Sequence, residues 1–540
     1  MCILRNRLLG QFGRLIRKIN MSNVPTSSLN KYIPVTEGKA TILFPKSNEV
    51  FYNPVQQFNR DMSIAAIRTW NMMFTEERRV QAEKKRIKKL QQKNEQEKQT
   101  TADSNEDAFE HRFTILEALA ASGLRSIRYA KEIPNLKYIV ANDLEPDAVE
   151  SIKRNMAHND IQEDLLRPNL GDACDVLYSH RHPGKRFDVI DLDPYGTASP
   201  FIDGAVQAVS DGGLLCVTCT DMQVLAGAAY SETCFSKYGG LPLKAEFCHE
   251  MGLRLVLNML QQSAARYKRY IVPLVSCSID FYVRLFVRVF TSPAEVKNSA
   301  SKTSLVYACS SCPTFVTQPM GKVSKTEKGI KYGIGSVPTN AECEFCGSKY
   351  HVGGPTWGHP IHNKDFVAKM LEHVKENKEA YQTHTRMIGM LTVISEELED
   401  PLYYTLSDLS GTLHCNTPPL LTLCSAILHA GYKVSASHAC VASIKTNAPN
   451  TVIWDIMRCW VKAHPVTEKN IKAGSPAAKI LSVEPIIEAN FTKHPESEPE
   501  SRKVKLVRYQ ANPEKNWGPK ARHKRKREEN PETDEPISKK

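Results

Sequence analysis

Between residues 113 and 290, short apolar runs alternate with longer stretches in which apolar residues recur at helical spacing. The short runs predict strands and the periodic stretches predict helices. Strands are expected at 113–118, 136–142, 169–173, 187–193, 213–218, 270–277 and 281–290. Helices are expected at 124–131, 146–159 and 243–266. Repeated strand–helix units predict an α/β fold, with a doubly wound, mainly parallel sheet that ends in an antiparallel hairpin.

The pattern outside this region divides the chain further, because 540 residues exceed what one hydrophobic core holds. Residues 76–109 are mostly Glu, Lys, Arg and Gln, which indicates an exposed helix or a disordered insertion. From about residue 470 the chain is rich in Pro, Glu and Lys and is expected to be disordered. The expected segments are 1–20, 21–75, 76–110, 111–297, 298–360, 361–468 and 469–540.

Composition narrows the class of partner. The formal net charge of +12 and the pI of about 8.9 favour an anionic partner such as nucleic acid. No apolar stretch approaches the roughly 18 residues that span a bilayer, so no membrane segment is expected. The cysteines are scattered and no secretory apolar segment precedes them, which indicates a reducing compartment rather than a disulfide scaffold.

Four cysteines form two CxxC pairs, Cys309 with Cys312 and Cys343 with Cys346. Each pair supplies one edge of a tetrahedron, and the chain between the pairs returns as a ribbon. This spacing predicts a Zn²⁺ site. Because four thiolates close the coordination sphere, we expect the metal to be structural rather than catalytic.

The strand predicted at 187–193 is followed by the turn Asp193-Pro194-Tyr195-Gly196. Proline and glycine end the strand there, at the carboxyl edge where open α/β sheets bind ligands. A turn made of an acid, a proline and an aromatic residue resembles the clamp with which amino-methyltransferases hold the target amine. The alternative is an ordinary exit from a strand into a turn.

Two more acids are expected at the same edge. Asp143 ends the second strand, 20 residues after Gly123, where a carboxylate accepts hydrogen bonds from ribose hydroxyls. Asp172 ends the next strand, where an adenine amine would be within reach. The alternative for each acid is a helix N-cap, and Pro146 makes that alternative strong for Asp143.

The two ends of the chain carry targeting-like patterns. Residues 1–20 are basic, contain no acid and place apolar residues on one helical face, which is typical of a mitochondrial presequence. The alternative is a basic arm that binds nucleic acid, and Met21 offers a second start without this segment. The basic run at 520–527 indicates a nuclear-import signal or an RNA-binding tail.

Small polar residues with Lys and His occur late in the periodic part of the chain, at 437–439 and 444–449. Ser437, His438 and Lys445 suit contacts with phosphate groups. An ordinary loop is an equally good interpretation of each residue.

Taken together, these motifs resemble the eukaryotic tRNA (guanine26-N2)-dimethyltransferase family over roughly residues 35–465. The resemblance rests on the four cysteines and on a set of short stretches. Those stretches are 51–54, 59–61, 117–125, 142–143, 171–173, 191–196, 430–432 and 445–449. Jointly they are specific, whereas none is specific alone.

The resemblance implies a class I, Rossmann-like methyltransferase with a seven-stranded sheet, a zinc-ribbon element and a smaller α/β C-terminal domain. It implies that Arg60, Arg125, Asp143, Asp172 and Ala173 contact S-adenosyl-L-methionine, with residues 21–75 contributing to that site. It also implies that the C-terminal domain holds tRNA, and that family members reach mitochondria and nucleus. No obligate protein partner is expected.

The expected chemistry is methylation of the exocyclic amine of guanine. Asp193 and the Pro194 carbonyl would accept the two N–H bonds of a flipped-out base, and Tyr195 would stack on it. Three alternatives remain. The clamp could serve an amine of another RNA or DNA base, the fold could bind RNA without catalysis, or the chain could be a zinc-ribbon adaptor.

Overall fold

The computed structural model describes residues 31–46, 52–94, 112–227, 229–327, 329–503 and 507. The predicted presequence 1–20, the second start at Met21 and the basic run 520–527 lie outside these residues, and they stay predictions.

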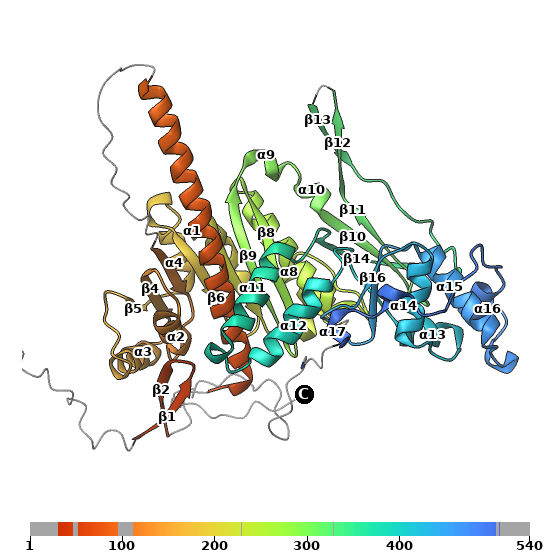
Figure 1. The fold of residues 1–540 in the computed structure, drawn as a ribbon, viewed down its shortest axis with the longest axis horizontal. Helices are drawn as coiled ribbons and strands as arrows, with labels where there is room; N and C mark the ends of the chain where they lie inside the picture. The colour runs from red at the N-terminus through yellow and green to blue at the C-terminus, as the bar shows by residue number, and fades with distance from the viewer. Residues whose placement is uncertain are drawn as a thin grey trace, which may run out of the picture.

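A seven-stranded sheet forms the centre of the protein (Figure 1). Its strands are β3 (Phe113–Glu117), β4 (Leu136–Asp143), β5 (Leu166–Leu170), β6 (Phe187–Leu192), β7 (Val209–Cys219), β8 (Arg269–Ile279) and β9 (Tyr282–Thr291). The order across the sheet is β5-β4-β3-β6-β7-β9-β8, and β9 runs in the opposite direction to the other six strands. The predicted α/β fold is confirmed. The third strand was expected at 169–173 but ends at Leu170, so Asp172 lies beyond it.

The register of the parallel strands brings their carboxyl ends together. Glu117 at the end of β3 pairs with Ala141 of β4 on one side and with Asp191 of β6 on the other. Residues that follow these strands therefore meet at one edge, here called the carboxyl edge. The opposite edge, where β7 and β8 begin, is called the amino edge.

Helices cover both faces of the sheet. One face buries α2 (Leu124–Glu132), α3 (Pro146–His158), α11 (Lys364–Glu376), α12 (His384–Glu396) and the first half of α1 (Gln57–Asn94). The other buries α4 (Ala173–Ser179), α5 (Ser199–Ala208) and α8 (Cys248–Ala265), with the short α6 (Met222–Leu225) and α7 (Ser231–Tyr238) beside them. A two-stranded ribbon, β1 (Tyr32–Glu37) with β2 (Ala40–Pro45), packs on α2 and α3.

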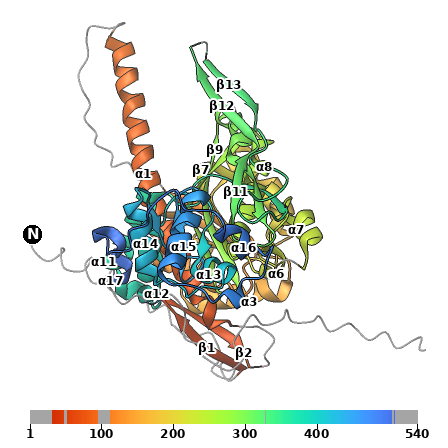
Figure 2. The same cartoon turned by 90° about the vertical axis from the view of Figure 1, so that its right-hand side faces the viewer.

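Helix α1 corrects one predicted boundary. The segments 21–75 and 76–110 were expected to be separate, but a single helix runs through residue 75. Its first half is apolar on one side, where Trp70 stacks on Phe74 with 4.6 Å between ring centroids. Its second half is charged and projects away from the body (Figure 2). The charged composition therefore marks the exposed end of a helix whose buried start holds it in place.

Residues 303–357 build the cysteine-bearing element. Its strands are β10 (Thr303–Cys309), β11 (Phe315–Pro319), β12 (Gly321–Thr326), β13 (Gly329–Ile334) and β14 (Tyr350–Trp357), preceded by α9 (Pro293–Val296) and α10 (Ser299–Lys302). Strands β11, β10 and β14 form an antiparallel sheet. Strands β12 and β13 form a separate hairpin that projects from the body (Figures 1 and 2).

The C-terminal segment has no separate core at the predicted boundary of residue 361, because α11 and α12 pack into the core of the main sheet. A third core starts near Tyr404 and includes the cysteines. Its elements are β15 (Tyr404–Thr405), α13 (Leu406–Leu413), α14 (Leu420–His429), β16 (Val434–Ser435), β17 (Ser443–Thr446) and α15 (Asn450–Ala463).

The predicted disorder from residue 469 is wrong for the part that the structure describes. Helices α16 (Pro476–Leu481) and α17 (Glu500–Lys503) pack on α13 and α12. Ile480 and Ala477 are buried in these contacts. Sparse apolar residues anchor this segment because a neighbouring surface is present to cover them, which composition does not reveal.

Candidate active site

The turn Asp193-Pro194-Tyr195-Gly196 follows β6 at the carboxyl edge, as the sequence predicts. Gly196 has a φ of 83°, a left-handed conformation that favours glycine. Its N–H donates to the Thr220 hydroxyl at 2.8 Å, and its carbonyl accepts from the Thr220 N–H at 2.7 Å. The turn is thus fixed to the end of β7, while Tyr195 within it is 69% exposed.

Arg125 holds the Asp193 carboxylate. The guanidinium of this buried residue forms an ion pair with Asp193 and donates to the Ser63 hydroxyl at 3.0 Å. Asp193 itself is 24% exposed at its side chain. A partly exposed carboxylate is therefore oriented from below by a buried cation. A charge-assisted pair of this kind holds the carboxylate in place.

A second, fully buried layer lies beneath this pair. Arg284 of β9 grips both oxygens of Asp191 at 2.8 and 2.9 Å, and the Tyr129 hydroxyl also donates to Asp191. Burial acts to raise the pKa of Asp191, but Arg284 and Arg125 outweigh it and lower that pKa. Asp191 thus stays charged, and Arg125 is set between Asp191, at 3.6 Å, and Asp193.

Glu117 completes the layer with the opposite behaviour. Burial raises the pKa of Glu117 to about 8, although Arg125 and a hydrogen bond from Ser126 oppose the rise. Glu117 therefore carries a proton at neutral pH. Two cations, Arg125 and Arg284, then face two carboxylates, Asp191 and Asp193, so the cluster is balanced in charge.

The cofactor-binding residues predicted after β3 and β4 also meet at this edge. Asp143 accepts hydrogen bonds from the Ala121 N–H at 2.8 Å and from the Glu145 N–H at 3.0 Å. Asp143 does not cap the next helix, since the residue at the N-cap position is Glu145. Each carboxylate oxygen retains capacity for a further donor. Gly123, with a φ of 76°, allows the tight turn that precedes α2.

The geometry of Asp172 agrees with the alternative interpretation, in which this acid is a helix N-cap. It is the N-cap of α4, and one of its oxygens accepts from the Cys174 N–H at 2.7 Å. Asp172 is exposed and Ala173 beside it is buried. Both lie just past β5 at the carboxyl edge, so the predicted position holds, while the contact with a cofactor stays a prediction.

Arg60 lies in a separate buried network. Its guanidinium donates to both Glu37 oxygens, at 2.6 and 2.5 Å, and to the Asn53 carbonyl at 3.2 Å. Glu37 also accepts from Arg128 at 2.8 Å, and Arg128 pairs with Asp61 at 2.7 Å. These contacts fix the start of α1 and the β1–β2 ribbon, so they give Arg60 a structural role, while its contact with the cofactor stays a prediction.

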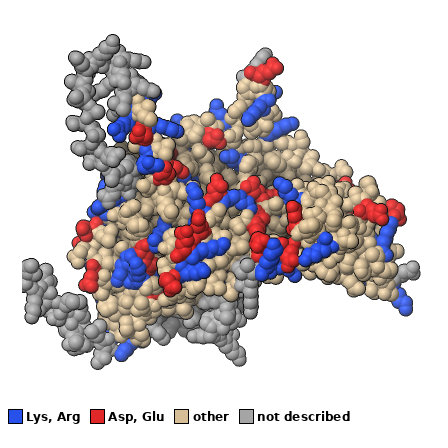
Figure 3. All heavy atoms as spheres, viewed as in Figure 1, with Lys and Arg blue, Asp and Glu red and all other residues tan. Residues whose placement is uncertain are grey.

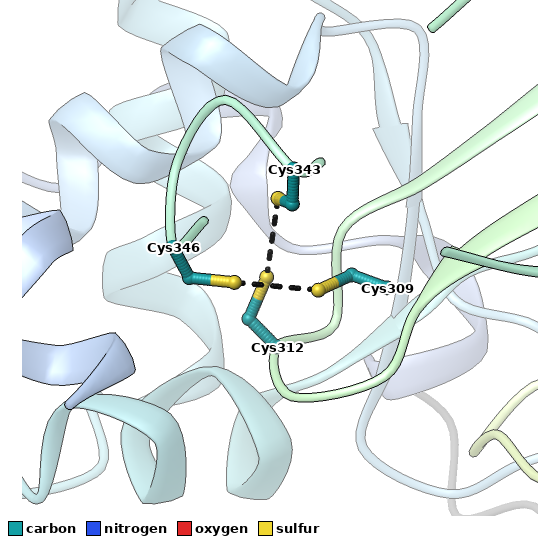
Figure 4. A group of neighbouring side chains, drawn as sticks. All are labelled: Cys309, Cys312, Cys343 and Cys346. Carbon is teal, nitrogen blue, oxygen red and sulfur yellow. Dashed lines mark hydrogen bonds between the residues drawn. The ribbon is translucent and has the colours of Figure 1, made fainter. Parts of the chain in front are cut away.

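The four cysteines converge, as the sequence predicts (Figure 4). Their Sγ atoms all lie within 4.8 Å of one another, with 3.3 Å between Cys309 and Cys346 and 3.8 Å between Cys312 and Cys343. Cys309 ends β10 and Cys312 lies in the turn that follows it, whereas Cys343 and Cys346 lie in the loop before β14. Thr314 fastens the group to the third core, since its hydroxyl accepts from Trp454 at 2.9 Å.

A second group, His362, Glu397 and His438, also brings potential ligand atoms within 4.8 Å of one another. Backbone N–H groups of β8 donate to His362 Nδ1, at 3.3 Å, and to His438 Nε2, at 3.2 Å. The opposite nitrogen of each ring therefore carries a proton and has no lone pair for a metal.

Lys445 makes the same group a charge network. Its ammonium contacts Glu397 and Glu250 at 3.0 Å each, and all three side chains are buried. Ser437 and His438 also bond to Glu397. The suggested phosphate contacts of Ser437, His438 and Lys445 are therefore wrong, because these side chains are buried against the main domain.

The sequence interpretation did not identify the layer beneath Asp193, namely Ser63, Glu117, Tyr129 and Arg284. These residues come from four separate elements, and no local motif joins them. Asp191, two residues before Asp193 on the same strand, was the one signal, because an acid inside a buried strand needs a cation.

The strand order across the sheet and the acid-Pro-Tyr turn at its carboxyl edge identify the fold as that of a class I methyltransferase. The model of the "N2,N2-dimethylguanosine tRNA methyltransferase" family matches residues 31–458. The chain belongs to this family.

Relatives agree with that assignment. A mouse protein named "tRNA (guanine(26)-N(2))-dimethyltransferase" is 50% identical over 90% of this chain and 76% of its own length. A Saccharomyces cerevisiae protein of the same name, designated mitochondrial, is 41% identical over 96% of this chain and 98% of its own. A solved complex of Trm1 from Pyrococcus horikoshii with S-adenosyl-L-methionine has a TM-score of 0.62 and 27% identity, covering 78% and 98% of the two chains.

Proposed function

We propose that this protein is an S-adenosyl-L-methionine-dependent enzyme that dimethylates the N2 amine of guanine 26 in tRNA. The observation that carries the proposal is the position of Asp193, a partly exposed carboxylate held by Arg125 on a fixed turn at the carboxyl edge. Family membership over residues 31–458 supports the same substrate and reaction.

The residues at the carboxyl edge fit the methyl donor. Asp143 has carboxylate capacity left for ribose hydroxyls, and the small residues between β3 and α2 let a ligand approach the backbone. Asp172 and Ala173 border the same edge, where they would contact the adenine. When bound there, S-adenosyl-L-methionine supplies an electrophilic methyl group.

The chain's own residues would grip the nucleophile. The guanine amine is a poor nucleophile because its lone pair is delocalised into the ring. Asp193 and the Pro194 carbonyl would accept its two N–H bonds and aim the lone pair at the methyl group. Tyr195, which is exposed, would stack on the base once it leaves the RNA stack, at a cost of a few kcal/mol. Methyl transfer depends on in-line placement, so positioning supplies most of the rate.

In this scheme Arg125 supports the clamp, whereas the resemblance assigns Arg125 to binding of the cofactor. Its guanidinium is engaged with Asp193 and Ser63, so it orients the clamp from below. To contact the cofactor as well, the Arg125 guanidinium would have to turn one of its N–H donors toward S-adenosyl-L-methionine. We assign it first to Asp193.

We assign Zn²⁺ to the four cysteines as a structural ion. The sulfur positions suit tetrahedral coordination, and four thiolates leave no open position for catalysis. Metal analysis of the purified protein should find one zinc per chain. A Cys343→Ser variant should lose the zinc and unfold more readily, whereas changing the partly exposed Cys174 to Ser should leave both unchanged.

The substrate and location follow from the same assignment. The partner is tRNA, and no helix among the described residues combines the length and apolar character needed to cross a bilayer. Residues 1–20 and the run 520–527 support import into mitochondria and the nucleus. Tagged chains that begin at Met1 or at Met21 would separate these two destinations.

The decisive experiment incubates the purified chain with undermodified tRNA and labelled S-adenosyl-L-methionine, then maps the methylated nucleotide. N2,N2-dimethylguanosine at position 26 is the expected product. A methylated adenine or cytosine would move the clamp to another base. Cofactor binding without any methyl transfer would reduce the protein to an RNA-binding fold.

A further inference from the structure

A basic hollow of about 290 Å³ lies at the amino edge of the sheet, away from Asp193. Five cations line it, and they come from three places: the segment around Pro183–Lys185, the end of α8 and the start of β8. They are Arg181, Arg186, Arg266, Lys268 and Arg269. No carboxylate lines it among the described residues. On the face drawn in Figure 3, acidic and basic side chains are interspersed.

Arg269 is the floor of this basic hollow. It is 1% exposed, and its terminal nitrogens donate to the carbonyls of Val209 at 2.8 Å and Ser210 at 2.9 Å. Its Nε is buried and has no hydrogen-bond partner among the described residues. A buried donor without a partner is costly, because it has lost its hydrogen bonds to water.

The positive charge of the hollow is not neutralised by the protein's own carboxylates. Burial and the like charge of Arg186 lower the pKa of Arg269 to about 10, and burial lowers the pKa of Arg186 as well. Two carboxylates lie at the border. Asp211 interacts with Arg186 and Arg269, and Asp203 lies 3.9 Å from Arg266. Five cations against two bordering acids leave an excess of positive charge.

Aromatic rings accompany the cations. Tyr267 lines the hollow, and its hydroxyl donates to Asp203 at 2.9 Å. Tyr178 donates to the same carboxylate at 3.1 Å. The two side chains are 38% and 40% exposed, so the shared acid holds both rings at the surface. Cations interleaved with exposed aromatic rings suit a nucleic-acid strand better than a small anion.

We propose that the basic hollow binds phosphate groups of the tRNA backbone and is a second RNA contact, remote from the clamp. Guanidinium groups match the geometry of phosphate oxygens, and no described contact within the protein occupies Arg269 Nε. Strand β6 has six residues, so the hollow lies roughly 20 Å from Asp193 across the sheet. A folded tRNA is long enough to reach both. The identity of the RNA rests on the proposed function.

The test removes three exposed cations of the hollow together, which spares the buried Arg269. The variant carries Arg181→Gln, Arg266→Gln and Lys268→Gln. The matched control removes three exposed lysines elsewhere and changes the net charge equally. It carries Lys85→Gln, Lys153→Gln and Lys325→Gln.

Affinity for unmodified tRNA is measured with the full chain across a series of salt concentrations, without any need for methyl transfer. The hollow variant should bind roughly tenfold or more weakly at low salt, and its salt slope should fall by about two, while the control stays near wild type. Its KM for tRNA should rise with kcat unchanged at saturation, because the clamp is intact. Equal affinities and slopes for variant and control would overturn the proposal.

A second arm separates RNA from a small phosphate source by titrating inorganic phosphate alone. Phosphate binding that the variant loses while its tRNA affinity is unchanged would also overturn the RNA assignment. A wild-type chain that binds tRNA through the hollow but transfers no methyl group would instead defeat the proposed function and leave this inference standing.

Discussion

Two clusters of buried charge differ in one respect that separates a site from a scaffold. Around Glu397, the charges of Lys445 and Glu250 and the ring of His438 satisfy one another inside the protein. Around Asp191, the buried Arg284 and Arg125 lead outward to Asp193, which remains partly exposed. Both clusters hold elements together, but only the second ends in a charged group that a ligand can reach.

Burial of charge alone therefore does not distinguish a site from a scaffold in this fold. Burial acts against the charge of Glu397, yet Lys445 and His438 outweigh it and hold the pKa of Glu397 well below its usual range. That network joins α8, α12 and β17 and so fixes the C-terminal segment to the main domain. The clamp uses the same chemistry to hold a carboxylate still at the surface.

The largest expected effect comes from breaking the sealed cluster. Lys445→Met would leave Glu397 and Glu250 buried without their shared cation, and should lower the free energy of unfolding by about 3–5 kcal/mol. Denaturant unfolding measures this. Lys433→Met is the control, since Lys433 is exposed nearby and should change stability little. Equal effects for the two variants would contradict the buried network.

The next largest effect is expected at Asp193, the partly exposed acid of the clamp. Asn has the shape of Asp without its charge, so Asp193→Asn tests the carboxylate and should lower kcat for tRNA methylation about 100-fold or more. Single-turnover methylation with labelled cofactor is the measurement. Asp175→Asn changes an exposed acid of α4 and should leave the rate unchanged. Wild-type activity of the Asp193 variant would remove this residue from the mechanism.

A third effect depends on pH, and within any one pH unit it is smaller than the two above. The folded pKa of Glu117 is raised from 4.5 to about 8, so between these values the folded state holds a proton that the unfolded state releases. Stability therefore falls as pH rises across this window, by up to about 1.4 kcal/mol per unit, and the slope ends above pH 8.

Glu117→Gln should remove that slope, so the variant gains on the wild type as pH rises from 5 to about 8. Chemical denaturation at several pH values measures it. Glu150→Gln, at an exposed position of α3, should keep the wild-type slope. A slope unchanged in the Glu117 variant would assign the titration to another group.

The smallest effect concerns the backbone of the clamp. Gly196→Ala places a side chain at a φ of 83° with nothing within 4 Å of the new Cβ, so conformational strain alone should cost about 1–2 kcal/mol. Gly411→Ala is also free of contacts but lies in α13, so it should stabilise by about 0.5–1 kcal/mol. Thermal unfolding of the pair should give opposite signs.

Three features could be predicted from the amino-acid sequence alone: the order of strands and helices, the acid-Pro-Tyr turn and the pairing of the cysteines. Each is a local signal: hydrophobic period, turn chemistry or spacing. The exit of Asp193 from β6 and the convergence of the four sulfurs follow from residues that are neighbours in sequence or come as fixed pairs.

The fold, rather than the sequence, showed which charges are buried together. Arg284 and Ser63 are 221 residues apart yet share a hydrogen bond beneath the clamp. Lys445 and His438, whose composition suits phosphate, are sealed inside, while Arg269 lines a basic hollow that no motif announced. The reason is physical: whether a charge faces a ligand or a counter-ion depends on which surfaces pack against it, and packing is set by contacts distant in sequence.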